Sequence, residues 1–132
     1  MILQKKRNGH IINIASTAAF QAIPTMATYA ATKAYVLSFS EAIAHELKNQ
    51  NVKVTAICPG ATQSEFAQTA DMGDPSIFNK APTSRELAEF TYKAMKKGKT
   101  TAIHGTKNSF LVFTTRLSPR KVVTAIAAKM VG

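Results

Sequence analysis

The chain of 132 residues carries 17 basic and seven acidic residues, for a formal net charge of +10, and 45% of its residues are hydrophobic. This length suits one domain, and this share of apolar residues suffices for a core, which excludes wholesale disorder. A single cysteine, Cys58, excludes a disulfide framework and a Cys-rich zinc site. No apolar run approaches the roughly 20 residues of a membrane span, and no signal-peptide pattern follows Met1. We therefore expect a soluble, cytoplasmic protein.

The first elements along the chain are a strand and a long helix. The β-branched run His10-Ile11-Ile12-Asn13-Ile14-Ala15-Ser16 predicts a buried strand. The stretch 26–49 has no Gly or Pro and is rich in Ala, Leu, Glu and Lys, which predicts a helix. This helix is apolar on two sides, as is typical of a helix packed between layers or subunits. One side carries Tyr29, Val36, Phe39, Ile43 and Leu47, and the other carries Ala30, Ala34, Leu37 and Ala44.

A second strand, a long loop, a helix and a third strand follow. The run 52–58 predicts a strand that ends before Pro59-Gly60. We interpret the irregular segment 61–82 as a functional loop, because structureless segments of this length are uncommon in compact domains. Three apolar residues lie in this loop, namely Met72, Ile77 and Phe78. Two interpretations are open: they form an apolar wall of the substrate site, or they pack beneath the loop. Thr83 and Glu86 form a capping-box pattern that begins a helix to about Lys97, and 100–104 predicts a short strand.

The alternation of strands and helices predicts an α/β fold with parallel strands joined by right-handed crossovers. Three strands are few for a parallel sheet, which is normally larger and covered on both faces. We therefore expect about three parallel strands of a partial, doubly wound sheet. We expect the chain to divide into two parts. Residues 1–105 form the α/β unit, and residues 106–132 form a basic, amphipathic C-terminal tail.

The positive charge is concentrated near the C-terminus, where residues 91–132 hold nine basic residues and no acidic one. Three interpretations are open: a solvated basic face, contact with an anionic membrane surface, and nucleic-acid binding. A basic surplus alone supports only non-specific contact with nucleic acid, so we expect no specific nucleic-acid partner. The membrane interpretation rests on apolar residues interleaved with charge, namely Phe110, Leu111, Val112, Phe113 and Leu117 with Arg116, Arg120, Lys121 and Lys129.

The residues that carry chemistry gather at the predicted carboxyl edge of the sheet. Tyr29 and Lys33 lie one helical turn apart, and a cation beside a phenol lowers the pKa of the phenol, which suits an acid/base. Tyr92 and Lys96 have the same spacing, so the pair alone is a weak signal. Context separates the two pairs, because Ser16 ends a predicted strand before Tyr29, at the edge where ligands approach an open parallel sheet.

In order and spacing, the segment 9–16, the run Tyr29-Ala30-Ala31-Thr32-Lys33, the Pro59-Gly60 turn and Ser64 resemble the C-terminal, catalytic half of a short-chain dehydrogenase/reductase. The resemblance covers about residues 1–105 and implies a Rossmann fold, an NAD or NADP cofactor, and interconversion of an alcohol and a carbonyl compound. It implies that Tyr29 is the acid/base, that Lys33 lowers the pKa of Tyr29 and binds the nicotinamide ribose, and that Ser16 holds the substrate oxygen. It also implies that the nicotinamide is lined by Pro59, Gly60, Thr62 and Ser64.

The sequence departs from the family pattern where the cofactor pyrophosphate would bind. Its six glycines are dispersed, so the Gly-rich turn has no counterpart, and neither has the catalytic Asn of the family. We therefore expect that the N-terminal dinucleotide-binding half is missing, that Met1 is an internal start or the gene has lost its front half, and that the chain alone is inactive. The alternative is a non-catalytic remnant or an interaction module.

Three further expectations concern partners, metals and the thiol. In the resembling family the helix at 26–49 packs in a subunit interface, which implies a homo-oligomer. The three histidines, His10, His45 and His104, lack metal-like spacing, so we expect no metal site. Cys58 lies within an apolar strand, and we expect a buried, inert thiol.

Overall fold

The computed structural model describes residues 8–64 and 80–131, and in these ranges three strands form one parallel sheet. The strands are β1 (Gly9–Ile14), β2 (Val52–Cys58) and β3 (Thr101–Ile103), in the order β1-β2-β3. The predicted α/β fold with three parallel strands is confirmed. The predictions for Met72, Ile77 and Phe78 concern residues 65–79, which lie outside the described residues, as do residues 1–7.

Each pair of neighbouring strands is joined through a helix, α1 (Ala27–Glu46) after β1 and α3 (Ser84–Lys96) after β2. Helix α1 ends three residues earlier than predicted, and the chain then turns through Asn51, whose φ of 55° is tolerated by asparagine. A short 3₁₀ helix that the sequence did not predict, η1 (Thr17–Phe20), follows β1.

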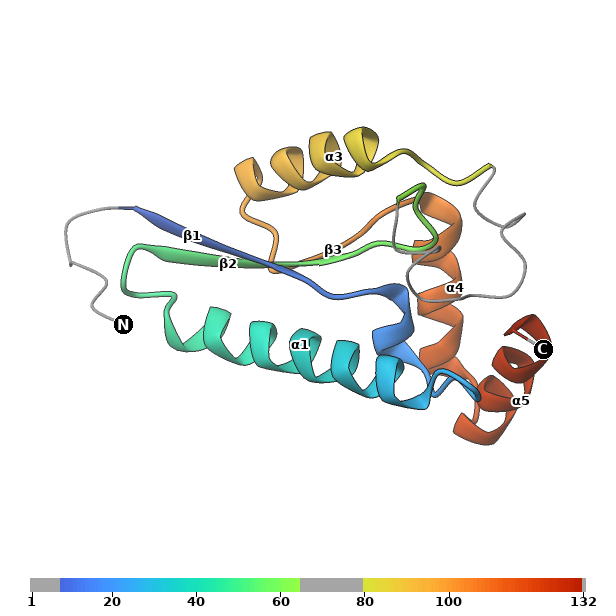
Figure 1. The fold of residues 1–132 in the computed structure, drawn as a ribbon. Helices are drawn as coiled ribbons and strands as arrows, with labels where there is room; N and C mark the ends of the chain where they lie inside the picture. The colour runs from blue at the N-terminus through green and yellow to red at the C-terminus, as the bar shows by residue number, and fades with distance from the viewer. Residues whose placement is uncertain (1–7, 65–79, 132) are drawn as a thin grey trace.

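The two crossover helices cover opposite faces of the sheet (Figure 1). Ala56 and Cys58 of β2 pack against Leu37 of α1, whereas Ile57 packs against Ala94 of α3. Because the strands succeed one another in a single direction while their helices lie on opposite faces, the two crossovers have opposite hands. The prediction of two right-handed crossovers is therefore wrong for one of them, since the long connection after β2 delivers α3 to the second face.

Strand β1 is less buried than predicted. Ile12 and Ile14 are 36% and 48% exposed, so the interpretation of a fully buried strand is wrong. The reason is position: β1 is an edge of this sheet, and α3 packs over Ile57 and Ala102 of the other two strands. Asn13, on the face toward α1, instead donates a hydrogen bond to the Ser40 hydroxyl at 2.9 Å.

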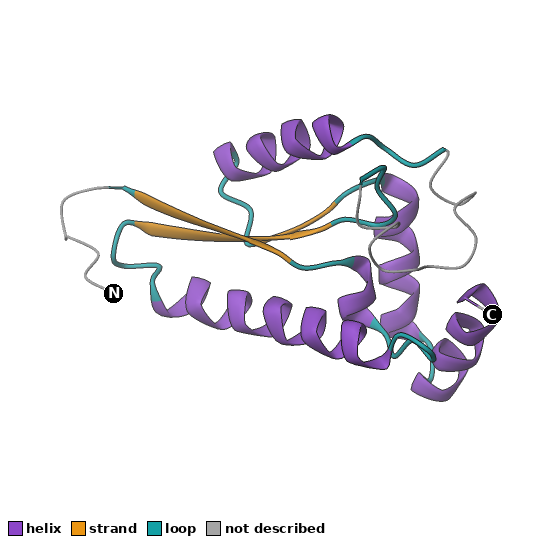
Figure 2. Ribbon diagram, viewed as in Figure 1, coloured by secondary structure: helices purple, strands orange, loops and turns teal. Residues whose placement is uncertain are grey.

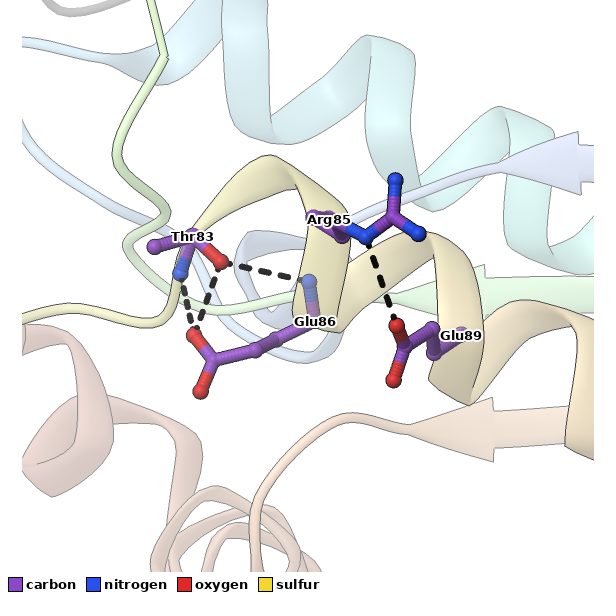
Figure 3. Close-up of polar contacts among 4 residues, drawn as sticks. All are labelled: Thr83, Arg85, Glu86 and Glu89. Atoms are coloured by element: carbon purple, nitrogen blue, oxygen red, sulfur yellow. Dashed lines mark hydrogen bonds and ion pairs between the residues drawn. The ribbon is translucent and has the colours of Figure 1, made fainter.

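Helix α3 begins with the predicted capping box (Figure 3). The Thr83 hydroxyl accepts from the Glu86 backbone N–H at 3.2 Å, and the Thr83 backbone N–H donates to the Glu86 carboxylate at 2.7 Å. Hydrogen bonds from the Thr83 backbone and hydroxyl hold the pKa of Glu86 below its ordinary value. This reciprocal bonding fixes where α3 begins.

The C-terminal segment forms two helices, α4 (Thr106–Leu117) and α5 (Arg120–Val131), which are separated at Ser118-Pro119 (Figure 2). Helix α5 packs back onto the start of α1, because Ala127 is buried among Ala18, Ile23 and Ala30. In residues 8–64 and 80–131, no helix has both the length and the apolar character needed to cross a membrane.

Candidate active site

Ser16 is held in place by backbone pairing on both sides. The Ala15 N–H donates to the Ile57 carbonyl at 2.8 Å, and the Thr17 N–H donates to the Pro59 carbonyl at 2.9 Å. The parallel pairing of β1 with β2 therefore continues past the end of β1 and encloses Ser16. Two strand ends thus fix the position of one hydroxyl at the carboxyl edge of the sheet.

The Ser16 hydroxyl also begins the short helix η1. Its oxygen accepts from the Ala18 backbone N–H at 3.1 Å, so Ser16 is the N-cap of η1. Its proton points to the Pro59 carbonyl at 3.5 Å, which is long for a hydrogen bond between oxygens. The Ser16 oxygen is thus oriented by the backbone N–H of Ala18.

Tyr29 and Lys33 lie on the first two turns of α1, as the sequence predicts. The Lys33 ammonium lies 5.7 Å from the centroid of the Tyr29 ring and donates a hydrogen bond to the Ile14 carbonyl at 3.0 Å. Ile14 is the last residue of β1, two positions before Ser16. Lys33 therefore connects the helix that carries the phenol to the strand end that carries the hydroxyl.

The second Tyr-Lys pair has the same internal geometry in a different setting. The Lys96 ammonium lies 5.5 Å from the centroid of the Tyr92 ring, so distance does not separate the pairs. Tyr92 is 57% exposed on α3, whereas Tyr29 packs against Ala18 and Ile23 beside η1. The two tyrosines thus differ in their surroundings and not in the geometry of their pairs.

The turn after β2 is closed by a side chain from α4. A Cβ on Gly60 would lie 2.5 Å from the Nδ2 atom of Asn108, so glycine is required while Asn108 occupies this position. Asn108 is itself held by a hydrogen bond from Nδ2 to the His104 carbonyl at 2.8 Å. This contact joins the turn after β2 to the segment after β3.

The remaining predicted cofactor residues lie on the same turn. The Thr62 hydroxyl donates to the Gly60 carbonyl at 3.2 Å, and Ser64 is exposed at the end of the described segment. Between them, Gln63 forms a bridge to Thr83: its N–H donates to the Pro82 carbonyl at 2.9 Å, and its carbonyl accepts from the Ser84 hydroxyl at 2.8 Å. The turn is thereby tied to the start of α3.

Cys58, at the end of β2, lies beneath this edge. Its side chain is fully buried, and burial raises the pKa of the thiol to about 11, with a smaller contribution from the charge of Glu41. The expected burial of the thiol is confirmed, and its inertness stays a prediction. In the described ranges no cluster of His, Cys, Asp and Glu could hold a metal ion.

A groove of about 720 Å³ lies on another face of α1, between η1 and the last two helices. Ala30 and Ala34 of α1 line it, together with Arg116 and Arg120, but Ser16, Tyr29 and Lys33 do not. The groove and the predicted catalytic residues are therefore separate features.

Three contacts around the candidate site were not predicted from the sequence. They are the bond from Lys33 to Ile14, the packing of Asn108 over Gly60, and the packing of Ala127 beside Tyr29. A glycine after Pro59 is a signal that another group packs closely against the backbone there, but nothing in the sequence indicated that this group is Asn108.

The comparisons with known proteins agree with this geometry. Residues 1–74 match the family model described as short chain dehydrogenase. The match covers more than half of the chain, and the chain therefore belongs to the short-chain dehydrogenase family.

An uncharacterized oxidoreductase from Staphylococcus epidermidis is 39% identical over 72 residues, which cover 54% of this chain and 31% of the relative. A 3-oxoacyl-(acyl-carrier-protein) reductase from Synechocystis sp. is 36% identical over 67 residues, covering 51% of this chain and 27% of the relative. The chain thus spans about a third of the length of these relatives.

A solved structure shows the same fold over nearly the whole chain. A short-chain dehydrogenase from Burkholderia cenocepacia, in complex with NADP, superposes with a TM-score of 0.75 at 24% identity. The superposition covers 93% of this chain and 48% of that protein. The α/β architecture described above is therefore that of a Rossmann-like short-chain dehydrogenase.

Proposed function

We propose that this chain carries the catalytic residues of an NAD(P)-dependent oxidoreductase that interconverts an alcohol and a ketone or aldehyde. The observation that carries the proposal is the position of Lys33, which lies beside the Tyr29 ring and is bonded to the strand end next to Ser16. The same pair of residue types on α3, Tyr92 and Lys96, has no such connection to a strand end among the described hydrogen bonds.

In this proposal each side chain has one task. The Ser16 hydroxyl, oriented by the Ala18 N–H, donates its proton to the substrate oxygen and fixes the position of that oxygen. The Tyr29 hydroxyl gives a proton to the oxygen in reduction and takes it back in oxidation. The Lys33 ammonium stabilises the negative charge that develops on the phenol oxygen during this transfer.

The nicotinamide cofactor, when bound, supplies or accepts the hydride. The residues present fit its nicotinamide end: Lys33 has three N–H donors, of which one bonds to Ile14, and it can also donate to a ribose hydroxyl. Pro59, Gly60, Thr62 and Ser64 would line the ring. The pyrophosphate end does not fit, because the described glycines are dispersed and form no tight turn.

Binding of cofactor fragments tests whether the chain holds the nicotinamide end of the cofactor and not the rest. We expect nicotinamide mononucleotide, observed by saturation-transfer NMR, to bind the 132-residue chain weakly, and adenosine monophosphate not to bind. Lys33→Met should abolish the nicotinamide signal, whereas the matched change Lys96→Met should leave it unchanged. Equal binding of both fragments, or equal effects of both substitutions, would contradict the proposed cofactor site.

Turnover is tested in a fusion of residues 8–131 behind the dinucleotide-binding half of a family relative. We expect reduction of small ketones or aldehydes that Tyr29→Phe lowers by about a hundredfold or more, while Tyr92→Phe has no effect. A fusion that binds cofactor and is equally active with Tyr29→Phe would refute the role of Tyr29. Turnover by the 132-residue chain alone would refute the proposed dependence on a second half.

A second candidate is an interaction module that assembles through α1, as a homo-oligomer with or without catalysis. Tyr35 and Phe39 of α1 stack with their ring centroids 5.9 Å apart, and they are 69% and 47% exposed. Light scattering after size exclusion should show an oligomer that Tyr35→Ser with Phe39→Ser converts to a monomer. An oligomer that gives no nicotinamide mononucleotide signal would favour this candidate over the enzyme. A cytoplasmic location stays a prediction.

A further inference from the structure

The two C-terminal helices each expose one row of large apolar side chains. The row on α4 consists of Phe110, Phe113 and Leu117, and the row on α5 of Val122, Ile126 and Met130. These six side chains, the tail rows, are between 47% and 74% exposed. Spacings of three and four residues place the members of each row on one side of their helix.

A different side of each helix faces the protein. Val112 of α4 and Ala127 of α5 are 6% and 3% exposed, and Ala127 packs beside Ala18 and Ala30. The helices are therefore attached by one apolar side while presenting a second apolar side outward. The outward rows add nothing to the core that the structure describes, and six large exposed side chains on two adjoining helices mark an interaction surface.

The charged side chains that α4 and α5 themselves carry are all cations. Lys107 on α4 and Lys121 and Lys129 on α5 are exposed, and the sequence has no acidic residue after Glu89. Helices that expose apolar rows and carry only cations are complementary to the interface of an anionic bilayer, where apolar side chains enter the acyl boundary and lysines contact headgroups.

The same charges disfavour other occupants. If a second copy of the chain docked through the tail rows, α4 and α5 of one copy would face α4 and α5 of the other. Since these helices carry basic but no acidic residues, the two copies would repel one another. Nucleic-acid backbones would engage the lysines but leave Phe113, Leu117 and Ile126 exposed to water. A bilayer removes the apolar rows from water and also offers anionic headgroups to the lysines.

We propose that α4 and α5 form a membrane-surface docking site for anionic lipid bilayers, with the tail rows inserted at the interface and Lys107, Lys121 and Lys129 at the headgroups. This site is separate from the proposed oxidoreductase chemistry, and it can be tested without turnover.

The test is co-sedimentation of the 132-residue chain with vesicles of phosphatidylcholine containing about one quarter phosphatidylglycerol. We expect binding at low salt, at least tenfold weaker binding to pure phosphatidylcholine, and a strong decrease as salt rises to about 1 M. Phe113→Ser with Ile126→Ser should reduce binding at least tenfold, and circular dichroism should be unchanged because both side chains are exposed.

A charge-matched pair of variants makes the test specific. Lys121→Gln with Lys129→Gln should weaken binding by about twenty-five-fold, since each basic residue near an anionic surface contributes about fivefold. Lys93→Gln with Lys96→Gln on α3 removes the same charge elsewhere and should have little effect. No binding at low salt, or equal losses in the two charge variants, would overturn the proposal. So would an oligomer that dissociates in the serine variant while vesicle binding persists.

Discussion

The ammonium of Lys33 donates a hydrogen bond to the carbonyl of Ile14 across 19 positions of sequence. This bond joins the second turn of α1 to the last residue of β1, and so it links the element that carries Tyr29 to the strand end that precedes Ser16. The lysine therefore has a structural contact that is independent of any bound molecule. Its loss should have two separable consequences, one for geometry and one for charge.

Substitution of Lys33 by Met should lower turnover of the fused enzyme by about a hundredfold, because both the tie to Ile14 and the positive charge beside Tyr29 are removed. Lys33→Arg keeps the charge and should retain more activity than Lys33→Met. Steady-state kinetics of both variants check this. Lys96→Met is the control, because Lys96 lies at a similar distance from the Tyr92 ring. Equal losses for Lys33→Met and Lys96→Met would contradict the assignment.

Ser16→Ala should affect stability and activity together. Loss of the bond from the Ala18 N–H removes the N-cap of η1, at a cost of about 1 kcal/mol in the free energy of unfolding. The proposed loss of turnover, about a hundredfold or more, should be additional. Thr83→Ala removes the N-cap of α3 and is the matched control, with a similar cost in urea unfolding but unchanged turnover. A Thr83→Ala variant as inactive as Ser16→Ala would show that destabilisation alone explains the loss.

Gly60→Ala should cost about 1 kcal/mol, because the new methyl group displaces Asn108 from its bond to the His104 carbonyl. In a background of Asn108→Ala the same change should cost almost nothing, since the obstructing side chain is gone. Urea unfolding of the two single variants and the double variant measures this coupling. Strictly additive costs would mean that Gly60 is required for another reason.

Burial of Cys58 should make stability fall at alkaline pH. Its pKa is raised from an ordinary value of 9.0 to about 11, so the folded protein disfavours the thiolate that the unfolded chain forms readily. The stabilisation is complete below pH 9 and is lost as pH rises toward 11, by about 2 kcal/mol. Urea unfolding of the wild type and Cys58→Ala across this range should show a steeper decline in the wild type. Parallel curves would mean that the thiol does not contribute.

Much of this fold follows from local patterns. The β-branched runs, the Gly- and Pro-free stretch and the capping box each reflect short-range chemistry, and each predicted its element to within a few residues. Ser16, Tyr29 and Lys33 were predicted as site residues because strand ends and helix starts meet at one edge of a parallel sheet, and because their order and spacing resemble the family pattern.

What the sequence did not predict depends on long-range packing. The exposure of Ile12 and Ile14 follows from which strand is the edge, and the hand of the second crossover follows from the face of the sheet on which α3 packs. Neither is encoded in the residues concerned. The same holds for Asn108 over Gly60, where two segments that are 48 positions apart meet only in the folded chain.

The bridge between Gln63 and the start of α3 determines which part of the sequence can vary without disturbing the fold. Two backbone hydrogen-bonding groups of Gln63 hold Pro82 and Ser84 at fixed distances, so both ends of the intervening segment are anchored whatever residues it contains. Because the entropy of closing a loop grows only slowly with its length, this segment can be lengthened, shortened or exchanged at little cost to the fold. The sheet and the side chains of Ser16, Tyr29 and Lys33 would keep their positions while this segment changes.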